Sequence, residues 1–378
     1  MIKSFKIRIY PTKTQEELIW QHIGSCRYIW NWMLAKQKEL YAAGEKHLSA
    51  FSMIKLLTPL KNDGEHGWLY DVSNTSLQIA CQDLQKAYDR FFKKISGFPK
   101  FKSRKRSKPS YPVCADRFYF VDNKTVQIQK LGKVRYKTDF SLPHGTEYKF
   151  SNPRITYRNG KWILSFGMEC ENQTPKLTNV SMGIDLGIKD LAIAECNGQI
   201  VFHNINKSKK MKELRKKQKH LQRSIARKYE ANKQGKKYIK TKNIERLENK
   251  LRKLYCHISN IRQNYIHQCT HALVSLFPSR VVMEDLNIKG MMKNKHLARA
   301  IQEQCLYEFI RQMRYKCEWN GIEFVQANRF YPSSKTCSCC GNVKQDLKLS
   351  DRIYKCDICG LKIDRDYNAA INLSKYTI

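Results

Sequence analysis

Residues 1–10 alternate between apolar and basic side chains, as in Phe5-Lys6-Ile7, and Pro11 follows them. A period of two is the pattern of a half-buried strand, and proline ends such a strand because it lacks an N–H donor. We therefore expect the chain to open with a strand.

The hydrophobic period then lengthens to three or four residues. Thr14 precedes two glutamates and an apolar series, which predicts a capped helix: Leu18, Ile19, Ile23, Tyr28, Ile29 and Trp32. A second helix is expected from about Ser73, on a similar series: Leu77, Cys81, Leu84, Tyr88, Phe91 and Phe92.

Between residues 112 and 170 the pattern returns to short alternating runs, namely RFYFV, KTVQI, KVRY, RITYR and KWILSFGME. Turn signals such as Asn159-Gly160 separate them, as in antiparallel sheets. We expect a small antiparallel barrel or sheet that includes the first strand. The helices at 13–95 are then an insertion between that strand and the others.

A third pattern starts near Val180, where VSMGID, DLAIAE and QIVFH predict three consecutive strands. A helical segment follows, and its apolar residues form a heptad-like seam: Ile244, Leu247, Leu251, Leu254, Ile258, Ile261 and Tyr265. The remaining expected elements are a strand at SRVVMED, a helix around 298–319, a strand at IEFVQA and a last helix from about Asp366.

Charge adds the first functional constraint. The 378 residues include 70 Lys+Arg and 33 Asp+Glu, a net charge of +37. A folded body with this charge repels itself, which favours a polyanionic partner. The basic residues are spread along the chain and not confined to one amphipathic helix, so nucleic acid is favoured over a membrane surface.

Two segments concentrate the charge. Residues 97–109 hold six basic and no acidic residues around Phe98 and Phe101. Residues 206–253 hold 20 Lys/Arg and four Glu. This second segment is either a solvated basic helix pair or a face that contacts nucleic acid.

The N-terminus lacks a signal-peptide core, and no uncharged apolar run reaches the length of a membrane span. We expect a cytoplasmic protein of the prokaryotic cytosol or nucleoid, with reduced thiols. Scattered cysteines are then expected to be small buried hydrophobes: Cys26, Cys81, Cys114, Cys170, Cys196, Cys256, Cys269, Cys305 and Cys317.

A cluster of cysteines predicts a metal site. Cys337, Cys340, Cys356 and Cys359 form two CxxC pairs separated by 15 residues, the spacing of a structural zinc ribbon with four thiolate ligands. Glycine follows each pair and permits a tight turn under the metal. Cys339 is an additional thiol that could replace Cys340.

Three acids follow or begin predicted elements: Asp185, Glu284 and Asp366. Singly, each is an ordinary turn or N-cap residue. The order of elements, however, is that of an RNase H-like fold, in which these positions converge. Three acids there can bind two divalent cations that activate water and stabilise a leaving oxygen, so we expect Mg²⁺.

The segments SMGIDLGIKDLA, VVMEDLNIKG and YPSSKTCSCCG…LSDRIYKCDICGLKIDRDYNAAINL resemble the TnpB family, transposon-encoded relatives of type V CRISPR effector nucleases. The opening IRIYPTKTQEELIWQHIGSCRYIWNWML and the basic GFPKFKSRKR are also similar, so the resemblance covers essentially the whole chain. It implies a guide-RNA-directed nuclease of double-stranded DNA that acts beside a short adjacent motif. The guide RNA would derive from the transposon end.

The resemblance also assigns residues. The family's catalytic acids map onto Asp185, Glu284 and Asp366, with Asp364 as a competing third acid. Asp366 is favoured because the family's metal ligand lies two residues before Asn368. Arg352 resembles an arginine near the scissile phosphate, or is a surface residue of the ribbon.

The implied fold is multidomain α+β. Residues 1–11 and 112–172 would form a wedge β-barrel with a helical recognition insertion at 12–111. Residues 178–330 and 361–378 would form a RuvC-like, RNase H-fold α/β nuclease domain. The domain would contain the basic helical segment 206–277 and an inserted zinc ribbon at 331–360.

Nucleic-acid contacts are expected in the insertion. Gln78 and Gln82 lie one helical turn apart and could present amides to adenine edges, or are simply solvated. The basic stretch suits backbone and stacking contacts through Lys100, Lys102, Arg104, Lys105 and Arg106.

Two other functions remain open. A guide-RNA-bound repressor would bind DNA without cutting, but would be expected to lack one of the three acids. A transposase that joins strands directly also uses three acids; the ribbon before the last acid favours the TnpB-like interpretation.

Overall fold

The computed structural model describes residues 1–171, 175–348 and 351–377. The chain forms two compact units, Met1–Glu171 and Asn172–Ile378, each described here by itself. Four positions inside the predicted domain bounds lie outside the described residues, namely 172 and 378 at segment ends and Leu349 and Ser350 in the predicted ribbon.

The first unit is built on a seven-stranded antiparallel sheet in the order β2-β6-β7-β1-β5-β4-β3. Its strands are β1 (Ile2–Tyr10), β2 (Ser110–Pro112), β3 (Phe118–Phe120), β4 (Thr125–Ile128), β5 (Gly132–Lys137), β6 (Phe150–Arg158) and β7 (Lys161–Glu169). β1 pairs with both β7 and β5, which confirms that the first strand joins the later ones.

The sheet of the first unit is strongly curved. Phe118 and Phe120 on edge strand β3 contact Phe150 of β6, with ring centroids 5.2 and 5.3 Å apart. In the strand order, β3 is at one edge of the sheet and β6 is next to the other edge. Because these two distant strands are in contact, the sheet must curl, and it encloses an aromatic core.

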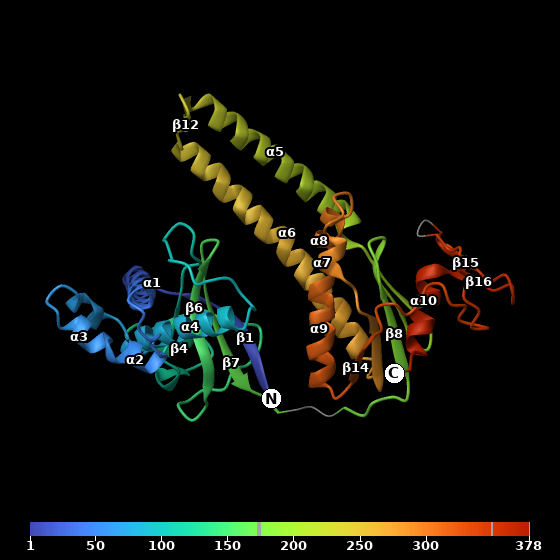
Figure 1. The fold of residues 1–378 in the computed structure, drawn as a ribbon, viewed down its shortest axis with the longest axis horizontal. Coiled ribbons are helices and arrows are strands. Elements are labelled where there is room, and N and C mark those ends of the chain that lie inside the picture. Colours follow the sequence, from blue (N-terminus) through green and yellow to red (C-terminus); the bar gives the residue numbers. More distant parts are fainter. Residues whose placement is uncertain (172–174, 349–350, 378) are drawn as a thin grey trace. The chain divides into compact units, whose positions relative to one another are not determined.

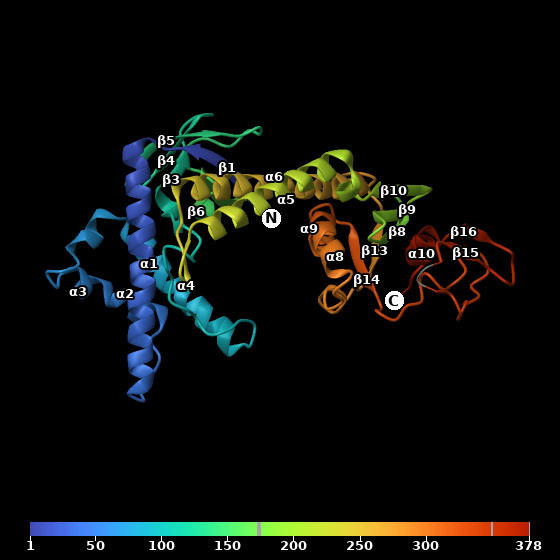
Figure 2. The same ribbon diagram turned by 90° about the horizontal axis from the view of Figure 1, so that it is seen from above.

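Four α-helices lie between β1 and β2: α1 (Lys13–Ala42), α2 (Ala50–Lys55), α3 (Leu57–Lys61) and α4 (Asn74–Phe92). Helix α1 begins at Lys13, as expected, but its N-cap is Thr12 and not Thr14, because Thr12 forms a capping box with Gln15. Residues of the helices and of the sheet share one hydrophobic core. Figure 2 shows the length of α1.

The second unit contains a five-stranded sheet in the order β10-β9-β8-β13-β14. Its strands are β8 (Ser181–Leu186), β9 (Asp190–Glu195), β10 (Gln199–His203), β13 (Arg280–Glu284) and β14 (Glu323–Ala327). β13 runs parallel to β8 and β14, and the first three strands are antiparallel. All five strands were expected from the sequence.

The basic segment forms two long antiparallel helices, α5 (Lys209–Ala231) and α6 (Lys242–Val274), joined by the hairpin β11 (Lys233–Gln234) and β12 (Lys237–Tyr238) (Figure 1). Ile244 and Ile258 of the predicted seam are buried, which confirms one-sided packing. The hairpin was not predicted, because its strands are only two residues long.

The helix expected around 298–319 is two helices, α8 (Ala298–Gln304) and α9 (Leu306–Trp319). Cys305 between them has a left-handed backbone with φ of 56°. The remaining elements are α7 (Ile288–Met291), β15 (Ile353–Lys355), β16 (Lys362–Asp364) and α10 (Arg365–Ser374).

Only some of the scattered cysteines are buried, as was expected of all of them. Five are buried, namely Cys26, Cys81, Cys114, Cys269 and Cys317, whereas Cys170, Cys196, Cys256 and Cys305 keep intermediate exposure. Among the described residues, no helix combines the length and apolar character that crossing a membrane requires.

Candidate functional site

Two of the predicted acids lie at the same end of two inner strands of the second sheet. β8 and β13 are parallel, and Ile184 lies opposite Met283 in their register. Asp185 and Glu284 are each the next residue along, so the two carboxylates emerge at the same end of neighbouring strands. Glu284 also accepts a hydrogen bond from the Ser333 hydroxyl.

Helix α10 brings the third acid to this end of the strands. Gly183 of β8 permits the close approach of the helix. A Cβ on Gly183 would lie 2.0 Å from the Ala370 carbonyl oxygen and 2.3 Å from the Ser374 nitrogen. Since real Cβ atoms do not come so close, only glycine at this position lets α10 pack directly on β8. Asp366 on the first turn of α10 then lines the same cavity as Asp185 and Glu284.

The cavity around the three acids has a volume of about 790 Å³. Desolvation raises the pKa of Asp185 well above its usual range, and the negative charges of Glu284 and Asp366 raise it further. The nearby Arg365 opposes this shift only in part. Two further carboxylates beside a buried one repel its negative charge, and this arrangement suits divalent cations.

Two arginines flank Asp366. The Arg365 guanidinium donates to Asp366 Oδ1 at 2.9 Å. Arg352 is closer to solvent, and its Nη1 lies 4.0 Å from Asp366 Oδ2. Both arginines line the cavity, so a phosphate entering it would meet positive charge beside the acids.

Asp364 has a different role from Asp366. It is the N-cap of α10, and its side chain accepts from the backbone N–H groups of Asp366 and Tyr367 at 3.0 and 3.2 Å. Because this carboxylate caps the helix, Asp366 is the better placed of the two to face Asp185.

Asn368 and Asn372 connect α10 to the segment 333–338, which leads into the first cysteine pair. The buried Asn368 side chain donates to the Thr336 carbonyl and accepts from the Ser338 N–H. Asn372, one turn later, donates to the carbonyls of Ser333 and Thr336 at 2.7 Å each. These bonds couple the orientation of α10 to the cysteine-rich insert.

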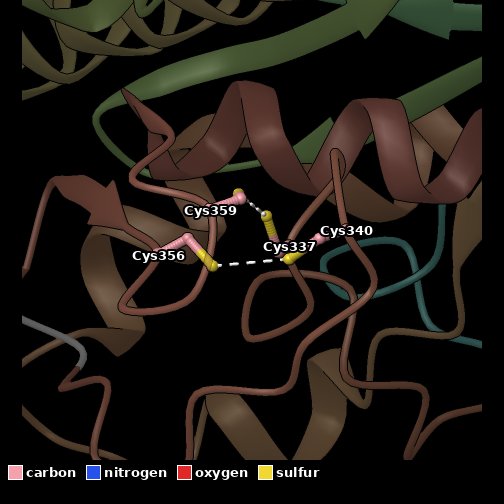
Figure 3. Close-up of side chains that lie close together, drawn as sticks. All are labelled: Cys337, Cys340, Cys356 and Cys359. Atoms are coloured by element: carbon pink, nitrogen blue, oxygen red, sulfur yellow. Dashed lines mark hydrogen bonds between the residues drawn. The ribbon is translucent and has the colours of Figure 1, made fainter.

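The four predicted cysteines converge in the insert. The Sγ atoms of Cys337, Cys340, Cys356 and Cys359 all lie within 4.8 Å of one another. Figure 3 shows their sulfurs turned toward a common centre. Four sulfurs about 2.3 Å from a tetrahedral zinc ion would be about 3.8 Å apart, so the residues fit this metal. Cys339 is exposed and outside the cluster.

The backbone turns tightly after each CxxC pair, and it favours the thiolate form of Cys356. Gly341 and Gly360 follow the pairs with φ of 76° and 72°, a region that suits glycine. A hydrogen bond from the backbone N–H of Cys359 is the largest of the effects that lower the pKa of Cys356 to about 6. The second pair lies between β15 and β16, and β16 leads directly into α10.

A polar network joins the base of α5 and α6 to the turn after Asp185. Glu303 pairs with Arg215 of α5, and its Oε1 lies 3.5 Å from Arg262 of α6. The neighbouring Gln304 donates to the Gly187 carbonyl oxygen at 3.0 Å. The break at Cys305 directly follows these two residues.

The predicted nucleic-acid residues differ in their surroundings. Lys100, Arg104, Lys105 and Arg106 are exposed, and Gln82 is exposed on α4 while Gln78 is half-buried. Lys102 is half-buried, with its Nζ 3.4 Å from the Trp30 ring centroid.

Sequence reasoning missed Gly183, Ser333, Arg365 and the network around Glu303. Gly183 interrupts an otherwise apolar strand, and this was the available signal for a close helix approach. The partners of the other residues depend on tertiary contacts, which leave no periodic pattern.

Three segments match family models. Residues 1–46 match "Helix-turn-helix domain", residues 165–295 match "Probable transposase", and residues 307–373 match "Cas12f1-like, TNB domain".

Full-length relatives are also similar. The chain is 31% identical to "Putative RNA-guided DNA endonuclease InsQ" of Escherichia coli (strain K12), across 98% of this chain and 91% of the relative. It is 30% identical to a "Putative RNA-guided DNA endonuclease" of Streptomyces pristinaespiralis, across 98% of this chain and 88% of that protein.

Among solved structures, CasPhi-2 (Cas12j) bound to crRNA aligns with 99% of this chain and 98% of its own, with a TM-score of 0.51 and 11% identity. The mini-RNA-guided endonuclease CRISPR-Cas_phi3 aligns with 99% and 92%, with the same TM-score and identity. At this identity the likeness bears on the fold alone, and supports a multidomain α+β chain.

Proposed function

The chain belongs to the TnpB family, and from this membership we propose that it is a transposon-encoded, RNA-guided endonuclease that cuts double-stranded DNA beside a short adjacent motif. The observation that carries the proposal is the convergence of Asp185, Glu284 and Asp366 in one cavity. A repressor that only binds would not need these mutually repelling acids.

We assign phosphodiester hydrolysis to this cavity. Mg²⁺ bound by the three carboxylates would supply an activated water and stabilise the leaving oxygen. Asp185 and Glu284 emerge from rigid neighbouring strands, and α10 carries Asp366 to them. Arg352 is exposed enough to contact a phosphate, and Ser333 orients the Glu284 carboxylate.

The strand order β10-β9-β8-β13-β14 supports an RNase H-like, RuvC-type nuclease fold for the second unit. The cysteine cluster would bind Zn²⁺ through four protein ligands, which leaves no open position for catalysis. Its role is to fix the insert that precedes α10.

For the first unit, the predicted division into a wedge at 1–11 and 112–172 and a recognition insertion at 12–111 is part of the same proposal. A guide RNA and a double-stranded DNA target would be its partners, and base pairing would read the target sequence. The net charge of +37 supports two such polyanions.

The test is cleavage by the purified complex of protein and copurifying RNA. With Mg²⁺, it should linearise a plasmid that carries the guide-matched sequence, and Asp185→Ala should lose this activity by several orders of magnitude while still copurifying with RNA. Cleavage that survives in Asp185→Ala would place catalysis elsewhere.

Glu323→Gln is a matched control. Glu323 begins β14, so it lies at the end of the parallel strands opposite to Glu284, and its side chain is 58% exposed. This variant should cut at the wild-type rate.

If the wild-type complex joins DNA strands in this assay and does not cleave the plasmid, the result would favour the transposase alternative.

A further inference from the structure

A second cavity, of about 580 Å³, lies in the first unit and is not part of the acidic site. It is bounded by α1, α4, the edge of the sheet and the basic stretch that follows α4. Its polar and aromatic lining consists mainly of Trp20, Arg27, Asp83, Lys102, Arg104 and Arg154. Sites for small organic ligands have volumes of about 300–1,000 Å³, a range that includes a nucleotide.

Trp20 gives this cavity an aromatic surface. Its ring meets those of Tyr157 and Trp162 nearly edge-on, with centroids 5.2 Å away in each case. These contacts fix the indole, yet 39% of the residue remains exposed. A fixed and accessible indole is suited to stacking on a planar base.

The basic stretch forms an ordered wall of the cavity. Trp30 Nε1 donates to the Lys100 carbonyl at 3.1 Å. Asn31 bonds both the N–H and the carbonyl of Lys102, at 2.7 and 2.9 Å. Two consecutive residues of α1 therefore hold the wall in place, although it has no regular secondary structure.

The cations that line the cavity are of two kinds. Lys102 and Arg154 already have partners, because the Lys102 Nζ lies over the Trp30 ring and Arg154 donates to Asp83 at 2.9 Å. Arg104 and Lys108 are exposed and Arg27 is half-buried. These three cations supply positive charge for a phosphate, and the two arginines can in addition form paired hydrogen bonds with it.

We propose that this cavity binds a single unstacked nucleotide of the bound nucleic acid, with its base on Trp20 and its phosphate near Arg27 and Arg104. The inference rests on the proposed function, because it specifies how the first unit contacts the polyanion. Guide RNA and an opened DNA strand share the required chemistry, namely a planar base linked to a phosphate. A paired base inside a duplex cannot enter, so the nucleotide must be extruded.

The experiment measures the affinity of full-length variants for the copurifying RNA, and of the RNA-loaded complexes for target DNA, across a series of KCl concentrations. Trp20→Ala should weaken one of these affinities about tenfold, the effect of losing one stacked base. It should leave the slope of log affinity against log salt unchanged. Arg104→Ala should weaken the same step and reduce that slope by about one phosphate contact.

Two further variants provide the comparison. Trp68→Ala is the control, because Trp68 is also 39% exposed in the first unit but lies outside the cavity, so its affinities should match the wild type. Trp20→Phe should restore most of the lost affinity by keeping a stacking ring. If the Trp20→Ala variant has a weaker affinity for RNA, the bound nucleotide belongs to the guide RNA. If only the affinity of the loaded complex for DNA is weaker, the nucleotide belongs to the target DNA.

Ultraviolet crosslinking of the wild-type complex followed by mass spectrometry keeps the test decisive if Trp20→Ala fails to fold. A nucleotide adduct on Trp20 or Arg27 supports the inference. Adducts elsewhere with none in the cavity overturn it, as does a folded Trp20→Ala variant with wild-type affinities. Wild-type protein that binds neither nucleic acid would instead overturn the proposed function, and this inference with it.

Discussion

Asp185 lies one residue before the end of strand β8, beside two further carboxylates, so its negative charge costs free energy unless a cation offsets it. Desolvation and then the charges of Glu284 and Asp366 raise its pKa. The folded state therefore binds this proton more tightly than the unfolded chain does. Stability of the metal-free protein falls as the pH rises from the ordinary aspartate range through the raised pKa.

Asp185→Asn should consequently stabilise the metal-free protein while abolishing cleavage. If removing the charge relieves about 1 kcal/mol, the unfolding midpoint at pH 7.5 should rise by roughly 2–4 °C. The gain should shrink at pH 4, where the wild-type carboxyl is protonated, and shrink again when Mg²⁺ is added to both proteins. Calorimetry at the two pH values checks this, and a lower midpoint for the variant at pH 7.5 would contradict it.

Helix α10 is short, and its position depends on elements on either side of it. Asn368 and Asn372 bond it to the segment at 333–338, and β16 enters it directly from the second cysteine pair. Gly183 sets how closely it packs on β8. The acid at its first turn is thus oriented by the cysteine-rich insert as well as by the sheet.

Replacing both Cys356 and Cys359 by Ser should release zinc and slow cleavage by at least about tenfold, since a misplaced third acid loses transition-state contacts. RNA copurification should persist, because the first unit has its own core. Cys339→Ser is the matched control, as this exposed thiol neighbours the cluster without joining it. Metal analysis that finds unchanged zinc in the double variant would refute the ribbon.

The elements themselves were largely predictable from hydrophobic period. The convergence of the acids was predictable from the order of elements, and that of the cysteines from their CxxC spacing. The break at Cys305 was not, because nothing in the apolar spacing from 298 to 319 marks it; it coincides with the contacts of Glu303 and Gln304 to other elements. The N-cap of α1 was misassigned because Thr12 and Thr14 are both acceptable caps, and only the Gln15 contact selects Thr12.

At the scale of the whole molecule, the excess charge is distributed over separate surfaces. The α5–α6 pair carries most of the basic segment 206–253, in which Glu248 accepts from Tyr229 and pairs with Lys240. The stretch at 97–109 forms the wall of a cavity in the other unit. Sequence composition predicted a polyanionic partner, but the folded position of each charge depends on tertiary contacts such as those of Asn31.

Protein that retains only a little nucleic acid should therefore aggregate at low ionic strength and recover at high salt, since one residual polyanion can bridge several copies that each carry a net charge of +37. Light scattering of such partly stripped protein between 50 and 500 mM KCl, with and without added guide RNA, checks this. A monodisperse and stable preparation of the partly stripped protein at 50 mM KCl would contradict it.

The location of the third acid has a consequence for the time course of translation. A ribosome adds Asp366 after Asp185, Glu284 and the whole cysteine insert, and domains fold as they emerge. The basic wall at 97–109 and the α5–α6 pair are complete long before the cavity of the three acids gains its last carboxylate. A nascent chain therefore presents its basic segments before this cavity is complete.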